Sequence, residues 1–410
     1  MSVSPSPLLR VVAMLAMPIA SAADPEVRTI SRQPSAVLAT PQVEVAVTLL
    51  GGHMAPVTFF RDTEHPLQPY SISPWQDEEA AEMPAPVLVP LRGDFFCLPF
   101  GGNGEPYRGE THPPHGEVAG SPWTVVGGSR AGRSATLTLA IEPRSRAGRI
   151  LKEVSLVEGQ NVVYTRHLVE GFAGKAPVGH HAILAMPEAE GTVRISTSPL
   201  AFGMTAPGVF SDPRKREYQA LLPGARWEDL AHVPAVRQDA EPADLTRLPG
   251  RYGHCDLVQL VNAPPSGDEP AWVAATFTDR GYVWFAVKDP KVLASTVLWM
   301  EYHGRHGYPW NGRNNCLGIE DVTASFADGL AASAAPDNPL AAAGARTVLD
   351  FGGGPVAINY IQGVVRTPPD FDTVDKVEFV PGRMTFVAAS GSRVTADVAW
   401  SFIGNGRLPE

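Results

Sequence analysis

The sequence predicts an all-β protein, a large antiparallel β-sandwich with few short helices, and three observations support this prediction. Most apolar residues fall in short runs in which apolar and polar positions alternate, the period of two that is typical of half-buried strands. These runs are rich in β-branched residues and are separated by Gly, Pro, Asn and Asp. The 40 prolines and 39 glycines are spread along all 410 residues, which favours many loops on one body over two hinged domains.

The first residues predict a cleaved export signal over residues 1–22. Arg10 precedes the apolar run "VVAMLAMPIA", and small residues then supply an A-x-A-like site for cleavage after Ala22 or Ala23. The apolar run is about half of the roughly 20 residues that a membrane span needs, so no stable membrane anchor is expected. We therefore expect a periplasmic or secreted protein. Residues 23–40 are polar and predict an irregular lead-in, followed by a single sandwich domain over 41–410.

Within this domain the strongest strand predictions are alternating or β-branched runs. They lie at residues 43–60, 134–143, 149–171, 271–279, 281–289 and 383–402. The segment "EGQNVVY" places a turn between two alternating runs, which predicts an antiparallel hairpin.

Helical patterns are few. Residues 216–222 could form about two turns, and residues 289–301 show some helical spacing with Pro290 near the start. Residues 327–345 are rich in alanine but are interrupted by two prolines, so they predict a loop with one short helix.

Composition excludes several classes of protein. The formal net charge of −10 and the lack of any Lys/Arg-rich run argue against a nucleic-acid partner. No G-x-G-x-x-G follows a predicted strand, so no dinucleotide cofactor is expected. Cys97, Cys255 and Cys316 form no C-x-x-C pair, and we interpret them as small buried residues rather than zinc ligands.

Three stretches carry side chains that could do chemistry, and the first is "HPPHGEVAGSPW", residues 112–123. His112, His115 and Glu117 lie close together in the sequence. The two prolines between the histidines impose an extended path that separates the imidazoles, so support for a metal site at His112 and Glu117 is slight. His115 is the stronger functional candidate because Gly116 allows a close approach of backbone or ligand; a solvated turn is the alternative.

The second stretch is "PVGHHAILAMP", residues 177–187. Adjacent residues of a strand point to opposite faces, so His180 and His181 cannot both face one pocket. For either histidine alone, a structural role is at least as well supported as a catalytic one.

The third stretch, residues 299–322, combines aromatic rings, amides and guanidinium groups ahead of two carboxylates. Flat rings stack on the C–H faces of a sugar, and amides and arginines hydrogen-bond its hydroxyls. A carboxylate beside them could act as a general base, and a stiff surface loop is the alternative interpretation. The candidates are Trp299, Arg305, Trp310, Arg313, Asn315 and Glu320.

Four segments together resemble the aldose 1-epimerase, or galactose mutarotase-like, family. They are "LGGHMAPVTF" (50–59), "HGEVAGSPW" (115–123), "GHHAILAMP" (179–187) and "PWNGRNNCLGIEDV" (309–322), in the order in which that family carries its motifs. The resemblance covers roughly residues 45–325. It implies the family's large antiparallel β-sandwich and the interconversion of the α and β anomers of a free sugar, with neither metal nor cofactor.

The resemblance also implies roles for individual residues. Glu320 corresponds to the family's base, His181 to its acid and His115 to the histidine that polarises the sugar near the ring oxygen. Arg or amide neighbours would help to keep Glu320 ionised. The remaining residues expected to bind the sugar are Arg92, Asn103, His180, Trp299, Trp310, Arg313 and Asn315.

Two points of this assignment stay open at the level of sequence. This chain has Gly179-His180-His181 where the family has an Asn-His pair, so either histidine could be the acid. Asp256 and Asp279 are alternatives for the family's sugar-binding aspartate, and neither is assigned.

The leading hypothesis is an exported aldose 1-epimerase-like isomerase that acts on a small sugar. A non-catalytic carbohydrate-binding protein of the same fold is the principal alternative. A hydrolase needs two carboxylates in one cleft, and Glu320 and Asp321 would point to opposite faces of a strand.

Overall fold

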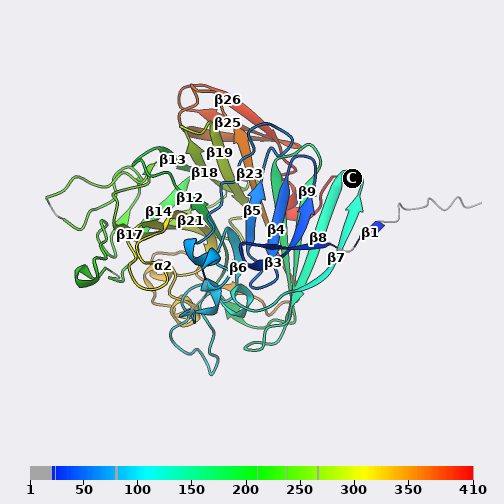
Figure 1. The fold of residues 1–410 in the computed structure, drawn as a ribbon. Coiled ribbons are helices and arrows are strands. Elements are labelled where there is room, and N and C mark those ends of the chain that lie inside the picture. The colour runs from blue at the N-terminus through cyan, green and yellow to red at the C-terminus, as the bar shows by residue number, and fades with distance from the viewer. Residues whose placement is uncertain are drawn as a thin grey trace, which may run out of the picture.

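The computed structural model describes residues 21–23, 25–78, 82–209, 211–237, 239–265 and 267–409. The predicted export signal therefore lies outside the described residues except for Ser21 and Ala22. Two large sheets form the body of the protein, and every strand pair within them is antiparallel. The prediction of an all-β sandwich is confirmed (Figure 1).

Sheet A has ten strands. In spatial order they are β1 (Ser21–Ala23), β7 (Thr124–Ala131), β8 (Ser134–Ile141), β9 (Arg149–Val157), β10 (Val162–Glu170), β23 (Val356–Arg366), β19 (Tyr282–Lys288), β18 (Ala271–Phe277), β13 (Val193–Thr197) and β16 (Arg247–Leu248).

Sheet B has eleven strands. In spatial order they are β15 (Arg226–Trp227), β14 (Leu200–Thr205), β17 (His254–Asn262), β20 (Ser295–Tyr302), β21 (Asn315–Thr323), β12 (Val178–Ala185), β6 (Asp94–Cys97), β5 (Met54–Thr58), β4 (Glu44–Thr48), β3 (Gln33–Ala39) and β2 (Glu26–Ile30).

Smaller elements complete the described part of the chain. Strands β24 (Val374–Val380), β25 (Arg383–Ala388) and β26 (Arg393–Asp397) form a third sheet, and β11 (Lys175–Ala176) pairs with β22 (Leu349–Asp350). The α-helices are short: α1 (Leu330–Ala334), α2 (Pro339–Ala342) and α3 (Phe402–Asn405). Single 3₁₀ turns occupy Pro74–Asp77, Pro86–Leu88, Glu117–Ala119 and Pro213–Lys215. No helix of the described ranges is long and apolar enough to cross a membrane.

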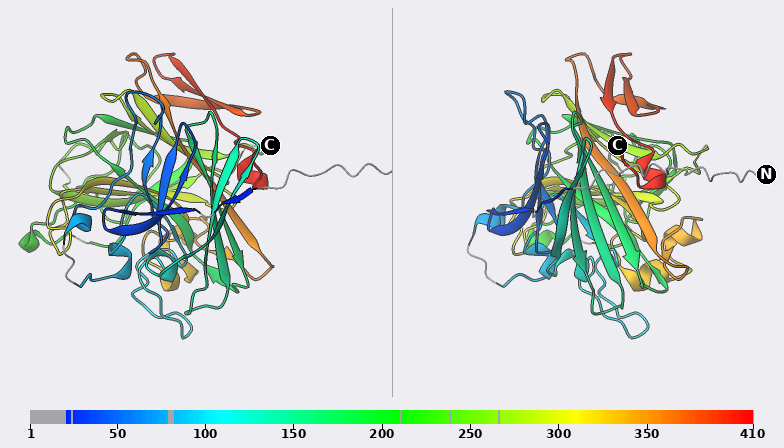
Figure 2. Two further views of the ribbon diagram at one scale, coloured as in Figure 1. Left: turned by 45° about the vertical axis from the view of Figure 1, so that its right-hand side comes forward. Right: turned by 90° about the vertical axis from the view of Figure 1, so that its right-hand side faces the viewer.

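The sheets stack in layers because their apolar faces pack against one another. The facing sides of sheets A and B enclose the main core, to which residues such as Leu139, Leu156 and Val47 contribute. The third sheet covers the outer side of sheet A, where Phe285 packs against Phe386 with ring centroids 4.9 Å apart. The right-hand view of Figure 2 shows the blue strands of sheet B on one side and the red C-terminal strands on the other.

Four expectations about local structure are wrong. Residues 23–40 are not irregular, because β2 and β3 form a hairpin at the edge of sheet B and β3 pairs with β4. Residues 289–301 do not form a helix, because Ser295–Tyr302 is β20, buried in the middle of sheet B, where pairing on both sides overrides the helical spacing. Residues 216–222 are irregular apart from isolated bridges. The alanine-rich stretch contains α1 and α2 rather than one helix.

Alternation along the central strands of sheet B separates two sets of side chains. On β12, His180 faces the core between the sheets whereas His181 faces the outer side, and on β21 Asp321 and Glu320 are divided in the same way. The outer side of sheet B carries its own apolar cluster, which includes Phe95, Ile183 and Val297 and against which Trp75, Val87 and Leu91 pack. The candidate site lies on this side.

Candidate functional site

A cavity of about 390 Å³ lies on the outer side of sheet B, within the range usual for small-molecule sites. Its polar side chains are His115, His181, Cys255, Arg305, Glu320 and Asp328. Its apolar side chains are Val87, Leu88, Leu91, Phe95, Ala206, Val209, Leu257, Trp299, Trp310 and Ala327. A few convergent polar groups in a largely apolar wall are typical of a binding or active site.

The register of β12 and β21 brings His181 and Glu320 together. Gly179 pairs with Val322 and Ala182 pairs with Ile319, so His181 lies directly opposite Glu320 on the neighbouring strand. His181 Nε2 and Glu320 Oε1 are 3.2 Å apart, and both side chains are almost completely buried. Two ionisable groups in contact on rigid strands form a preorganised pair that can exchange a proton.

The surroundings of this pair favour its neutral form. Burial raises the pKa of Glu320 well above its ordinary value, and Arg305 opposes that shift only in part. Burial also lowers the pKa of His181, with further contributions from the neighbouring His115 and His53. Both shifts favour a protonated Glu320 carboxyl beside a neutral His181 imidazole. Arg305 acts on Glu320 in the expected direction, but burial outweighs it.

His115 occupies a loop that brings its ring to the pair. Its ring centroid lies 5.1 Å from that of His181 and 5.1 Å from that of Phe100. Its Nδ1 accepts the backbone N–H of Gly101 at 3.4 Å, which leaves the ring proton at Nε2. Burial lowers the pKa of His115 to about 4, so the imidazole is neutral at pH 7.

Gly116 allows this loop to approach the sheet, as the sequence predicted. Its φ is +78°, and a Cβ at this position would lie 2.1 Å from the carbonyl oxygen of Leu98. His115 itself has a φ of 61°, an uncommon conformation for a residue with a side chain. Strained backbone of this kind is concentrated at functional sites.

A stack of rings holds His181 in place. Phe95 on β6 stacks on His181 with centroids 4.5 Å apart, and His53 stacks on the other face of Phe95 at 4.1 Å. His53 Nε2 lies 2.9 Å from the carbonyl oxygen of Ala119, and burial lowers the pKa of His53 to about 3. His53 is thus a neutral positioning residue behind the pair.

Three buried polar atoms at the cavity have no hydrogen-bond partner among the described residues. They are Glu320 Oε2, His181 Nδ1 and Trp299 Nε1. Buried polar groups are rarely left unpaired, since each costs about 1–3 kcal/mol. Their convergence supports a polar ligand at this position.

The part of the wall beside this pair is aromatic. Trp299 on β20 and Trp310 pack edge to face with centroids 5.5 Å apart, and Trp75 packs against Trp310 at 5.0 Å. The guanidinium carbon of Arg305 lies 5.9 Å from the ring centroid of Trp299 and 5.6 Å from that of Trp310. This wall offers aromatic faces and a cation beside the proton-exchanging pair.

Five of the predicted site residues line the cavity: His115, His181, Trp299, Trp310 and Glu320. The other five lie elsewhere. His180 is between the sheets, where its Nδ1 is 2.9 Å from Asp94 Oδ2 and its ring stacks on Tyr360. Because adjacent residues of β12 point to opposite faces, only His181 of these two histidines lines the cavity.

Arg92 is a structural residue. Its guanidinium donates to the carbonyl oxygens of Ile30 and Ser31 at 3.0 Å, and it also bonds Gln76. These contacts tie the turn between β2 and β3 to the segment that covers the cavity. Arg313 pairs with Glu78 and Asn315 donates to the carbonyl oxygen of Pro187, so neither reaches the cavity.

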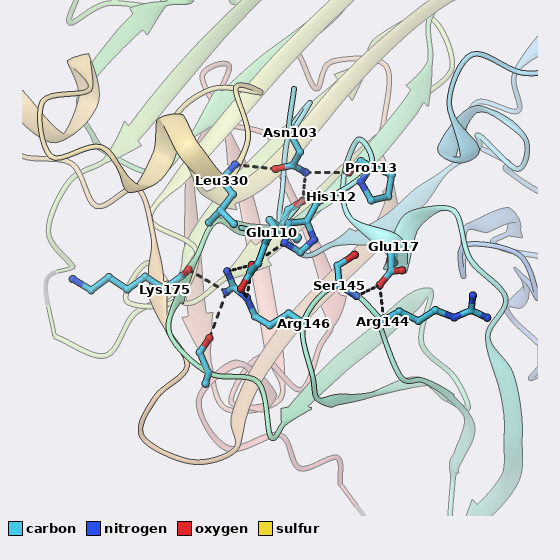
Figure 3. Close-up of polar contacts among 12 residues, drawn as sticks. Asn103, Glu110, His112, Pro113, Glu117, Arg144, Ser145, Arg146, Lys175 and Leu330 are labelled. Atoms are coloured by element: carbon cyan, nitrogen blue, oxygen red, sulfur yellow. Dashed lines mark hydrogen bonds and ion pairs between the residues drawn. The ribbon is translucent and has the colours of Figure 1, made fainter. Parts of the chain in front are cut away.

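Asn103 fixes the loop that follows β6 (Figure 3). Its Nδ2 donates to three backbone carbonyls of this region, and its Oδ1 accepts the N–H of Leu330 at 2.8 Å. In the same view His112 bonds Glu110, and Glu117 accepts backbone N–H groups of Arg144 and Ser145. His112 and Glu117 therefore serve different partners rather than one ion. The described ranges hold no group of three or more His, Cys, Asp or Glu suited to a metal.

Two charged residues also line the cavity: Arg305, already a candidate of the third stretch, and Asp328, which the structure adds. Arg305 belongs to the aromatic loop noted in the sequence, where its position between two tryptophans was a usable signal. Asp328 lies just after β21, in a stretch whose alanine content drew attention away from it. Asp256 is occupied by the backbone N–H groups of Ala220 and Leu221 and does not line the cavity. The three cysteines are free and buried, as expected.

The fold is similar to those of several solved structures. They are a galactose mutarotase-like protein from Clostridium acetobutylicum (10% identity, 83% of this chain and 98% of that chain, TM-score 0.51), a galactose mutarotase related enzyme from Lactobacillus acidophilus (13%, 84% and 100%, 0.50) and a Klebsiella pneumoniae protein provisionally assigned as an aldose 1-epimerase (10%, 83% and 82%, 0.56). No protein-family profile and no curated protein matches this sequence. The likeness shows that this chain has the galactose mutarotase-like fold.

Proposed function

We propose that this protein interconverts the α and β anomers of a free sugar by acid/base ring opening and reclosure. The observation that carries the proposal is the His181–Glu320 pair, held at 3.2 Å on adjacent strands and facing a cavity with an aromatic wall. Anomerisation needs one proton donor and one proton acceptor at neighbouring oxygens of the sugar. The neutral pair provides both at neutral pH.

In the proposed reaction Glu320 protonates the ring oxygen while His181 Nε2 removes the proton of the anomeric hydroxyl. The bond between the anomeric carbon and the ring oxygen breaks, and the open-chain aldehyde forms. Rotation about the C1–C2 bond presents the other carbonyl face. Closure returns one proton to Glu320 and takes one from His181, so the pair is restored.

These roles are the reverse of those that the family resemblance implies. The reason is physical: burial raises the pKa of Glu320 and lowers that of His181, and both shifts favour a protonated carboxyl beside a neutral imidazole. His115, with its ring proton at Nε2, would donate a hydrogen bond to the sugar. Asp328 at the cavity wall would accept one from a hydroxyl, which gives the sugar-binding aspartate a candidate.

The direct test is an NMR anomer-exchange assay on freshly dissolved α-glucose and α-galactose at slightly acidic pH. We expect the protein to accelerate exchange and Glu320→Gln to abolish the acceleration while sugar binding persists. A protein that binds these sugars without accelerating exchange would instead be a non-catalytic carbohydrate-binding protein, for which the aromatic wall would suffice.

A further inference from the structure

A second cavity of about 270 Å³ adjoins the first. Cys255, Arg305 and Trp310 line both cavities, so the two share a wall. Arg305 stands in this wall with 43% of its side chain exposed, and its guanidinium offers five N–H donors. The two cavities are therefore neighbours on the same side of the molecule, with these three side chains between them.

The second cavity has aromatic side chains that are unusually exposed. Tyr218 and Tyr308 line it with exposed fractions of 43% and 45%, although large aromatic side chains are mostly buried in folded proteins. Glu217 also lines it and contributes an acceptor. Exposed rings with an acidic group and a guanidinium match the C–H faces and hydroxyls of a sugar, as in the first cavity.

The second cavity is held by its own hydrogen bonds. Glu217 Oε1 accepts the backbone N–H groups of His306 and Gly307 at 3.0 and 3.3 Å, which joins the two loops that form the walls. The loop that carries Trp310 is closed by a bond from the N–H of Gly312 to the carbonyl oxygen of Arg305 at 2.8 Å. A preformed site loses less free energy on binding than a loop that must first become ordered.

We infer that the second cavity is a sugar subsite and that the preferred ligand is a reducing oligosaccharide. Its reducing-end unit would occupy the first cavity, where the anomeric carbon meets His181 and Glu320. The next unit would pass Arg305 and Trp310 and lie against Tyr218 and Tyr308. The placement of the reducing end rests on the proposed function, whereas the existence of the subsite does not.

The test compares affinities measured by calorimetry for cellobiose, maltose and lactose with those for glucose. At least one disaccharide should bind about tenfold more tightly than glucose, equivalent to about 1.4 kcal/mol. Tyr218→Ala should remove this gain and leave glucose binding and turnover unchanged. The backbone N–H of Cys255 donates to the carbonyl oxygen of Tyr218, a contact that the substitution preserves. The matched control is Tyr252→Ala, which changes a tyrosine 65% exposed and outside both cavities.

The outcomes separate this inference from the proposed function. A disaccharide advantage that disappears in Tyr218→Ala but not in Tyr252→Ala supports the subsite, even if no sugar is turned over. Anomer exchange on glucose with no disaccharide advantage overturns the subsite and leaves the proposed function standing. An equal loss in both tyrosine variants also overturns the subsite, because the effect would not be local to the second cavity.

Discussion

Glu320 and Asp321 are adjacent carboxylates on β21, and we predict that the amide variant of one loses activity whereas the amide variant of the other loses stability. Glu320 faces the cavity and contacts His181. Asp321 faces the core between the sheets, where Oδ1 lies 2.6 Å from Lys288 Nζ and Oδ2 accepts the hydroxyl of Tyr360 at 2.7 Å. Glu320→Gln should abolish turnover in a stable protein, whereas Asp321→Asn should destabilise a protein whose site is intact.

The magnitudes follow from these contacts. Lys288 is fully buried, so loss of its charged partner costs about 3–5 kcal/mol. That is a large part of the roughly 5–15 kcal/mol by which proteins are stable. The amide introduced by Glu320→Gln would match a protonated carboxyl in shape, so its effect on stability should stay within about 1 kcal/mol. Loss of a general acid should lower kcat by about 10²–10⁴-fold.

The assay combines urea unfolding with NMR anomer exchange on the same preparations. Asp321→Asn should unfold at a clearly lower urea concentration, with exchange activity per folded molecule within a few-fold of the native value. Glu320→Gln should unfold near the native midpoint without accelerating exchange. Glu320→Gln with native activity, or Asp321→Asn with native stability, would refute the assignment of the two faces.

Four further predictions concern the site and the leader. Gly318→Ala should lower kcat by at least about tenfold, because the new Cβ would lie 2.6 Å from Glu320 Oε1 and displace that carboxyl. Circular dichroism should show that the variant keeps its fold. A native kcat would contradict the role of Glu320. The pH–rate profile should fall at acidic pH, below the ordinary range of histidine, as the proposed base His181 becomes protonated, and should fall at high pH as Glu320 loses its proton. Arg305→Gln should move the high-pH limb upward, since Arg305 lowers the pKa of Glu320; an unmoved limb would exclude Glu320 as the acid. Intact-mass measurement of exported protein should show a chain that begins just after Ala22 or Ala23, and a chain that begins at Met1 would refute the signal.

The sequence was sufficient to predict the fold class because period-two alternation records the two faces of each strand. Predictions from the sequence were wrong where strand pairing in the sheet overrides the local hydrophobic pattern. Residues 289–301 have helical spacing, but Ser295–Tyr302 is paired on both sides inside sheet B. Glu26–Ile30 is polar because it lies at the edge of sheet B, where exposure removes the apolar signal.

The candidate site was predictable where chemistry and strand alternation coincide, as at His181 and Glu320. Arg92 and Asn103 were wrongly predicted to bind the sugar, because both donate hydrogen bonds to backbone carbonyls instead. The sequence alone does not distinguish a polar side chain that bonds the backbone from one that binds a ligand. Asp328 was missed because its position depends on the path of the chain after β21. Contacts of that kind are set by tertiary packing and leave no periodic pattern.

The two sides of β21 also explain why an acid/base pair can work without net charge. In the core, Asp321 forms an ion pair with Lys288, whose Nζ lies within hydrogen-bond distance of the carboxylate. On the outer side, Glu320 has no cation within hydrogen-bond distance among the described residues, and burial acts on it and on His181 at once. One cause therefore shifts the two pKa values in opposite directions and leaves a donor beside an acceptor. An added cation in contact with Glu320 would favour its ionised form and remove the donor, so the proposed reaction depends on the apolar wall of the cavity.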